Sequence, residues 1–295
     1  DGPATAAGAE LHLEADTGGT FALPLTAGDG TATLTFAGRI PFGVVDPDGL
    51  EWAPAGLTGV AATGFEDIAD PNGVVVLDQA AELDQLLASD PAAHDRFGES
   101  VAVDGDTAVI GVPGDDDSGA AYVFTRDGAG WTQEAKLTAS DATSYDWFGS
   151  SVAIDGDTVV VGAHKDGDNG ESSGAAYVFT RSGATWSEQA KLTASDGAKH
   201  DRFGESVAID GDTTVIGAPN DDDNGGTSGS TYVFTRSGTS WNEQAKLTAS
   251  DAASRDQFGY SVAVDGDTAV IGARNDDDNS EDSGSAYVFT RSGTT

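Results

Sequence analysis

Four acidic loops hold carboxylates at a spacing that suits a cation site. Each loop carries two aspartates separated by one residue: Asp115 and Asp117, Asp166 and Asp168, Asp221 and Asp223, and Asp276 and Asp278. Calcium takes about six to eight oxygen ligands, and alternate aspartates on a tight turn direct their carboxylates at one point. Asn169, Asn224 and Asn279 add neutral oxygen donors to three of the loops. The pattern therefore predicts weak Ca2+ binding by these eight aspartates.

The same loops also fit a second interpretation. They do not complete the calcium-loop pattern D-x-[DN]-x-[DN]-G, because other residues stand at its third ligand: Gly119, Gly170, Gly225 and Ser280. Acidic loops can instead be solvated surface. The chain holds 50 acidic against 14 basic residues, a net charge of −36. We favour the solvated-surface interpretation, and weak binding of salt cations is compatible with both.

The acidic excess also indicates the setting in which the chain folds. Charge repulsion of this size opposes compaction, and at about 1 M salt, where the Debye length is roughly 3 Å, it is largely screened. We therefore expect a protein of a salt-loving microbe. The charge predicts no nucleic-acid partner, and no apolar run reaches the roughly 18–20 residues of a membrane span. The chain has no Met, so Asp1 is expected to be a processed or cut end, as removal of a secretion signal would leave.

The residues do not form a recognisable catalytic set. The sequence contains no Gly-x-Ser-x-Gly elbow, no HExxH motif and no phosphate-binding glycine loop. Its histidines occupy positions that the repeats described below do not require to be His, and we interpret them as surface variation: His12, His94, His164 and His200. We expect no catalytic residues and no organic cofactor site.

A repeated unit positions the acidic loops. Phe-Gly pairs begin at Phe97, Phe148, Phe203 and Phe258, at spacings of 51, 55 and 55 residues. Each copy holds apolar stretches rich in Val, Ile, Tyr, Phe and Thr, which favour strands; in the first copy they read ESVAV, TAVIGV, AAYVF and TQEAKLT. An Asp-Gly pair at Asp104 predicts a tight hairpin between the first two. The pattern predicts an all-β fold, a β-propeller of four-stranded antiparallel blades that stack to bury both faces.

The order FG-x-SVA, (V/I)GAP and SGSAYVF resembles the FG-GAP repeat of integrin α-subunit-type β-propellers, over about residues 80 to 295. GAP is intact at Gly217-Ala218-Pro219 and varied to GVP, GAH and GAR elsewhere. The resemblance implies extracellular adhesion, with a protein or glycan ligand at the cell surface. It also implies calcium held by a longer DxDxDG loop between the first two strands. That place here holds only DGDT, so the family's metal loop is shortened.

The repeats also predict the domain organisation. Residues 1–78 have short alternating runs broken by Gly-Gly and Asp-Gly, which predicts a small β-rich N-terminal domain, and residues 79–295 form the propeller. The fourth copy stops before its last strand, while residues 82–88 match that strand. Three arrangements remain open: this segment closes a four-bladed ring, the chain is part of a longer ring, or a neighbouring molecule completes the open end.

These expectations lead to three functional hypotheses. The first is an exported, non-enzymatic binding or adhesion protein of a halophilic microbe, which uses the propeller to present acidic loops. The second is a structural subunit of an extracellular filament, cell envelope or virion, with copies of itself as partners. The third is a propeller-type hydrolase or lyase. The recurring basic residues are expected to form ion pairs within or between blades: Arg126, Arg181, Arg236, Arg291, Lys136, Lys191 and Lys246.

Overall fold

The computed structural model describes residues 10–14, 20–24, 84–128, 130–278 and 280–292. By its contacts the chain divides into two units, Asp1–Ala81 and Glu82–Thr295. No helix among the described residues is long and apolar enough to cross a membrane.

The first unit contributes one described element. Strands β1 (Glu10–Glu14) and β2 (Thr20–Pro24) pair as an antiparallel hairpin. The remainder of the N-terminal domain predicted over residues 1–78 lies outside the described residues. The boundary of that predicted domain stays a prediction.

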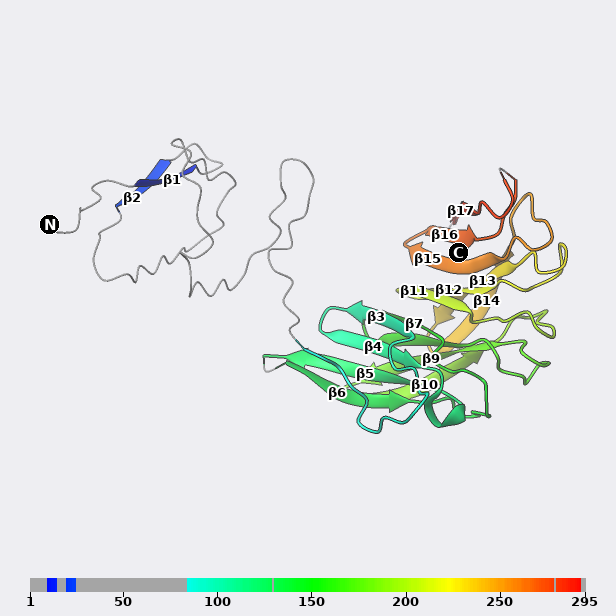
Figure 1. Ribbon diagram of the computed structural model, residues 1–295, viewed down its shortest axis with the longest axis horizontal. Helices are drawn as coiled ribbons and strands as arrows, with labels where there is room; N and C mark the ends of the chain where they lie inside the picture. The colour runs from blue at the N-terminus through cyan, green and yellow to red at the C-terminus, as the bar shows by residue number, and fades with distance from the viewer. Residues whose placement is uncertain (1–9, 15–19, 25–83, 129, 279, 293–295) are drawn as a thin grey trace. The chain divides into compact units, whose positions relative to one another are not determined.

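The second unit consists of four antiparallel sheets, which we number as blades 1 to 4 in chain order (Figure 1). Blade 1 contains β3 (Ser100–Asp104), β4 (Thr107–Val112), β5 (Ala120–Asp127) and β6 (Gly130–Leu137). Blade 2 contains β7 (Ser151–Asp155), β8 (Thr158–Ala163), β9 (Ala175–Ser182) and β10 (Thr185–Leu192). Blade 3 contains β11 (Ser206–Asp210), β12 (Thr213–Ala218), β13 (Ser230–Ser237) and β14 (Ser240–Leu247). Blade 4 contains β15 (Phe258–Asp265), β16 (Thr268–Ala273) and β17 (Ser285–Thr290).

Strand order within each blade follows the chain, as the repeat predicts. In blade 1, Asp104 pairs with Thr107, which leaves a two-residue turn that begins at Gly105 with a φ of 54°. A left-handed φ of this kind suits glycine, because glycine has no Cβ to clash with the backbone. The predicted Asp-Gly hairpin and the all-β propeller fold are thereby confirmed.

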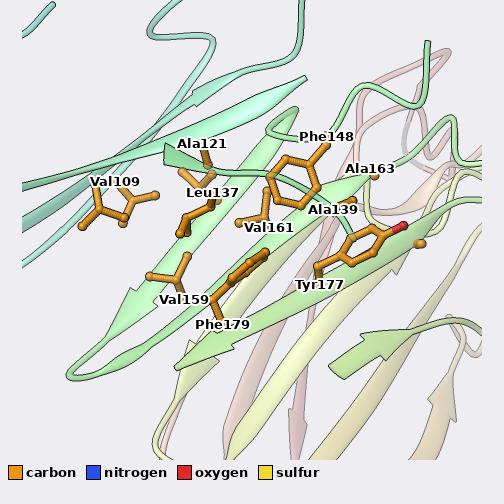
Figure 2. Close-up of a cluster of buried hydrophobic side chains, with 13 residues drawn as sticks. Val109, Ala121, Leu137, Ala139, Phe148, Val159, Val161, Ala163, Tyr177 and Phe179 are labelled. Atoms are coloured by element: carbon orange, nitrogen blue, oxygen red, sulfur yellow. The ribbon is translucent and has the colours of Figure 1, made fainter. Parts of the chain in front are cut away.

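The core lies between adjacent blades. Phe148 of the second FG pair is fully buried, with its ring centroid 5.4 Å from that of Tyr177 in an edge-to-face arrangement. Val109 of blade 1 and Val159 of blade 2 belong to the same buried cluster (Figure 2). Neighbouring sheets thus bury their facing apolar sides against each other, as blades with apolar faces require.

Two glycines of the repeat meet where neighbouring blades touch. A Cβ built on Gly162, at the end of the second strand, would lie 2.1 Å from the carbonyl oxygen of Gly204, the FG glycine of blade 3. The Ser151 hydroxyl donates a hydrogen bond of 2.8 Å to that carbonyl. Only glycine leaves room for this contact. The FG and GA motifs are therefore the two sides of one seam between blades.

The segment that resembles a fourth strand lies on blade 1. Leu86 and Ala88 pack against its apolar cluster beside Phe97 and Trp131, and the Ser89 N–H donates to the Gln133 side-chain oxygen at 2.9 Å. Among the described residues, β17 has only β16 as a neighbour. From residue 84 onward, where the structure describes it, the segment does not pair with β17, so these residues do not form the four-bladed closure considered from sequence.

Candidate functional site

The first aspartate of every acidic loop is buried beneath a tyrosine. These aspartates are 2–3% exposed: Asp115, Asp166, Asp221 and Asp276. In blade 2, the Tyr177 hydroxyl from β9 donates to Asp166 at 2.9 Å, and the corresponding tyrosine does so in each of the other blades. Burial raises the pKa of Tyr177, and the neighbouring carboxylates add to this effect, so the hydroxyl keeps its proton.

The second aspartate of each predicted pair behaves differently in blade 1. In the other three blades it lies beside the first, and its own backbone N–H donates to the first carboxylate; these residues are Asp168, Asp223 and Asp278. The first loop is shorter and forms a single 3-10 turn at Asp115–Asp117. There Asp117 is exposed, and its backbone carbonyl accepts the Tyr145 N–H. The structure therefore brings seven of the eight predicted aspartates into four clusters and leaves Asp117 outside.

Sequence reasoning missed one aspartate in each cluster. Asp141 accepts the Tyr177 hydroxyl at 2.7 Å and lies 36 positions before it. The equivalent residues in the other blades are Asp90, Asp196 and Asp251. The signal was present in the recurring Ala-Ser-Asp that follows each fourth strand. Only the fold shows that this aspartate reaches the acidic loop.

A lysine ammonium occupies the cluster in blades 1 to 3. In blade 2, Lys191 of β10 lies 2.8 Å from Asp141, 2.8 Å from Asp166 and 2.7 Å from Asp168. Lys246 makes the equivalent three contacts in blade 3. In blade 1, Lys136 binds both carboxylates of the cluster, Asp90 at 2.8 Å and Asp115 at 2.7 Å. The ammonium stands where a bound cation would stand. This confirms the predicted ion pairing of these lysines.

The pKa shifts support a permanent charge on the ammonium. Burial by itself lowers the pKa of Lys191, but the hydrogen bonds that its ammonium donates to Asp141 and Asp166 outweigh this effect and raise the pKa overall. Burial likewise raises the pKa of Asp141, and the bond from Lys191 reverses this, so the pKa falls below its usual value. Each partner keeps the other ionised at neutral pH.

Blade 4 has the carboxylates without the ammonium. Asp251, Asp276 and Asp278 bring carboxylate oxygens within 4.8 Å of one another. Within the described part of the chain, no lysine contacts this group. The negative charge of Asp276 raises the pKa of Asp278, as expected for carboxylates that lack a bridging cation.

The recurring arginines connect the opposite edge of the blades. Arg181 binds Asp157 of its own hairpin at 2.7 Å and donates to the hydroxyl of Thr107 in blade 1 at 3.2 Å. Arg236 and Arg291 repeat this arrangement with the blade before them, and Arg126 binds Asp106. These contacts confirm that the arginines form ion pairs and link neighbouring blades.

A cavity of about 300 Å3 opens among three consecutive blades. Its walls carry seven side chains: Glu99, Trp147, Ser150, His164, Lys165, Arg202 and Glu205. Ser151, the first residue of β7, pairs with Gly162, near the end of β8. The residues before the first strand and those after the second therefore share one edge with the acidic loops. We call this edge the loop face.

Charged groups dominate the cavity. Lys165 lies with its ammonium 3.3 Å from the ring centroid of Trp147, and the Arg96 guanidinium lies 5.0 Å from the same ring. His164 bonds to the Ser150 hydroxyl at 2.9 Å, and its other ring nitrogen is 3.6 Å from Glu205. His164 is 6% exposed, so the interpretation of this residue as surface variation is wrong.

The ionisation states follow from burial and the surrounding cations. Burial lowers the pKa of His164 to about 3, and the positive charges of Arg202 and Lys165 act in the same direction. Burial also raises the pKa of Glu205 and lowers that of Lys165. At neutral pH the imidazole is therefore uncharged, and the positive charge of the cavity comes from its lysine and arginine.

The cavity positions differ from blade to blade, unlike the seam and the aspartate clusters. The position of Trp147 holds Arg96, Arg202 and Gln257 in the other copies. The position of His164 holds Pro113, Pro219 and Arg274. The position of Lys165 holds Gly114, Asn220 and Asn275. The position of Ser150 holds Glu99, Glu205 and Tyr260. Variation concentrated on one edge of an otherwise repeated frame is typical of a binding surface.

Comparison with known proteins defines the class. The model of the FG-GAP repeat matches residues 81–124, 131–179, 186–234 and 241–289. Each match joins a fourth-strand segment to the first three strands of the next blade. With this fold and more than half of its length matched, the protein is an FG-GAP β-propeller. The chain belongs to the FG-GAP repeat family.

Solved structures show only weak overall similarity. The computationally designed Ika4 protein has a TM-score of 0.44 and 13% identity, over 70% of this chain and 99% of that one. Sqt1 of Saccharomyces cerevisiae has a TM-score of 0.39 and 12% identity, over 62% of this chain and 44% of that one. The N-terminal domain of Nup159 has a TM-score of 0.37 and 9% identity, over 65% and 44%. No curated protein matches the chain.

Replacing the central lysine tests the role of the cluster. We expect Lys191→Met to lower the free energy of unfolding by about 3–5 kcal/mol, because it leaves buried Asp166 without its cation. The matched control is Lys199→Met, which removes an exposed pair with Glu171 and should cost less than about 1 kcal/mol. Urea unfolding in multimolar potassium chloride measures both. Equal costs for the two variants would show that the cluster is not a buried ion pair.

Proposed function

We propose that this protein is a non-enzymatic binding or adhesion protein, exported by a salt-loving microbe, whose loop face contacts a protein or glycan at a cell surface. One observation carries the proposal. The repeat keeps its seam and its buried aspartates in every blade, and it changes residue type at the positions that line the cavity. A rigid frame that holds variable side chains along one edge suits recognition.

The charge of the chain supports both a high-salt environment and a binding role for the loop face. The net charge of −36 would keep the surface hydrated and the fold compact only where salt screens the repulsion. The family resemblance favours an extracellular location and adhesion, although a shared fold does not by itself fix function. The loop face, with its cations and aromatic ring, is the part of the described surface best suited to a specific contact.

Selective blocking of the two edges tests this proposal. The chain contains no cysteine, so Ser144→Cys on the loop face and Ala184→Cys in the β9–β10 turn at the opposite edge can each be coupled to a bulky polymer. Binding to halophilic cells, followed by fluorescence, should fall by more than about tenfold for the first conjugate only, because it covers the contact residues. Equal retention of both conjugates, or no retention of the unmodified chain, would count against adhesion through this edge.

Calcium binding is proposed only for blade 4. There the carboxylates of Asp251, Asp276 and Asp278 converge without a lysine, and carboxylate oxygens are suitable calcium ligands. In the other blades the ammonium already fills that place. This assigns the predicted Ca2+ to one loop rather than to all four.

Thermal unfolding with calcium added at constant ionic strength tests the assignment. Calcium should raise the melting temperature, because it binds only the folded chain. At a calcium concentration of about 100 times the Kd, the free energy of unfolding should increase by about 2.7 kcal/mol. Asp278→Asn should abolish the rise, and Asp223→Asn, in the lysine-filled cluster of blade 3, should leave it. An unchanged melting temperature of the original chain would remove the metal site.

The end blades favour a second candidate, a structural subunit. Val101 is 70% exposed in blade 1, whereas Val152 at the same position in blade 2 is 8% exposed; Val288 of blade 4 is 67% exposed, whereas Val178 is fully buried. A groove of about 360 Å3 beside β17 is lined by Leu247 and other residues of blades 3 and 4. A fourth strand from another copy would fill this groove, and a blade of that copy would cover Val288, as blade 3 covers Val178.

Light scattering in multimolar salt tests the assembly. A mass well above the 29.8 kDa of one chain would support a structural subunit. Val288→Asp should then return the mass to that of a single chain, because a carboxylate cannot be buried without a partner. Val288 is exposed in the single chain, so the substitution should leave the fold intact, and circular dichroism checks this. A strict monomer at all concentrations would exclude this candidate.

A further inference from the structure

We propose that the cavity lined by Trp147, His164 and Lys165 binds an acidic saccharide, such as a uronic acid residue. Its carboxylate would be held by Lys165 and Arg202, and one of its hydroxyl groups would donate to Glu205. The inference rests on the proposed binding role of the loop face, and it names the chemical class of the ligand.

The first support is a group of three basic residues without close ion pairs, in a chain with few basic residues. Of the 14 basic residues, all but Arg39 lie in the described part of the chain. Eight of these thirteen bind a carboxylate at 2.8 Å or less: Arg126, Lys136, Arg181, Lys191, Lys199, Arg236, Lys246 and Arg291. Of the five that do not, Arg96, Lys165 and Arg202 gather at the cavity.

Two carboxylates, Glu99 and Glu205, also line the cavity, but none of the three cations binds either of them at less than 4.0 Å among the described residues. Within the described residues, Lys165 and Arg96 contact the Trp147 ring and form no ion pair, and Arg202 reaches Glu205 only at 4.0 Å. Like charges held together in a half-buried place repel one another, and an anion between them relieves that repulsion. The cavity therefore fits a ligand that carries a negative group.

The second support is an acceptor without a donor. The Oε2 atom of Glu205 is buried and has no hydrogen-bond partner in the structure, and the nearest His164 nitrogen, at 3.6 Å, is too far to supply one. A buried carboxylate oxygen without a hydrogen bond is costly. The ligand must therefore bring a donor close to its negative group. Chloride and acetate have no such donor.

The size of the cavity and the chemistry of its walls together indicate the chemical class of the ligand. A cavity of about 300 Å3 accommodates a group of the size of one sugar ring. A uronic acid carries its carboxylate on a ring whose other carbons bear hydroxyl groups, so one small unit supplies both the anion and the donor. An acidic peptide has carboxylates at the ends of flexible side chains that lack a donor of their own. Nucleic acid is disfavoured by the negative charge of the remaining surface.

Substitutions that the repeat already contains provide the test. Lys165→Asn introduces the residue found at this position in blades 3 and 4, and Glu205→Ser introduces the residue of blade 2, so both are compatible with the frame. The matched control is Lys199→Asn, an exposed lysine outside the cavity that pairs with Glu171. Circular dichroism in multimolar salt should give the same spectrum for all three variants and the original chain.

Isothermal titration with glucuronate, at constant ionic strength, gives the readout. The original chain should bind glucuronate at least about tenfold more tightly than either glucose or acetate, because only glucuronate supplies both groups. Lys165→Asn should weaken binding of glucuronate by about tenfold or more, and Lys199→Asn should not. Glu205→Ser should weaken the binding of glucuronate without weakening the binding of acetate.

Several outcomes would overturn the proposal. One is the absence of binding heat with glucuronate. Another is an equal affinity of the Lys165→Asn and Lys199→Asn variants for glucuronate. A third is tighter binding of an oligo-aspartate peptide than of glucuronate. If the loop face still retains the chain on cells while glucuronate does not bind, the saccharide assignment fails and the binding role stands. If glucuronate binds and cells are not retained, the cavity is a saccharide site and the adhesion role fails.

Discussion

The close approach of neighbouring backbones at the blade seam is the constraint on which the rest of the structure depends. The carbonyl of Gly204 lies where a Cβ of Gly162 would be, and the Ser151 hydroxyl binds it. The same FG segment also pairs with the preceding blade, since the Phe203 N–H donates to the Ser173 carbonyl at 2.9 Å. Any side chain at these glycines would push the blades apart. The repeat therefore keeps small residues and a serine at the seam.

The seam also explains why polar groups can be placed with precision on the loop face. It anchors the residues that precede each first strand and those that follow each second strand, so the acidic loop and the cavity wall are both attached to it. Phe148 fills the space beside Tyr177, whose hydroxyl then reaches Asp141 and Asp166. Apolar packing on one side of the tyrosine ring thus fixes a carboxylate cluster on the other side.

Much of the fold could be predicted from the sequence, because its signals are local. Apolar strands, the Asp-Gly turn at Gly105 and the in-phase repeat lie within short stretches of chain. The site was predicted only in part. Alternation of aspartates identified the loops, but it could not show that Lys191 fills the cluster or that Asp141 joins it, since these contacts need the folded blade. The cavity combines three blades, so no single stretch of sequence contains it.

The four blades repeat the same aspartate cluster with different neighbours, so comparing them shows what each residue contributes. The aspartate cluster appears with a lysine in blades 1 to 3 and without one among the described residues of blade 4, while the surrounding tyrosine and turn are retained. The lysine is therefore not required to bring the carboxylates together; the fold does that, and the cation responds to the charge that results. In the cavity the charges are of the opposite sign. There the frame brings Lys165 and Arg202 together with Glu205 no closer than 4.0 Å to the guanidinium, so that the two positive charges repel each other.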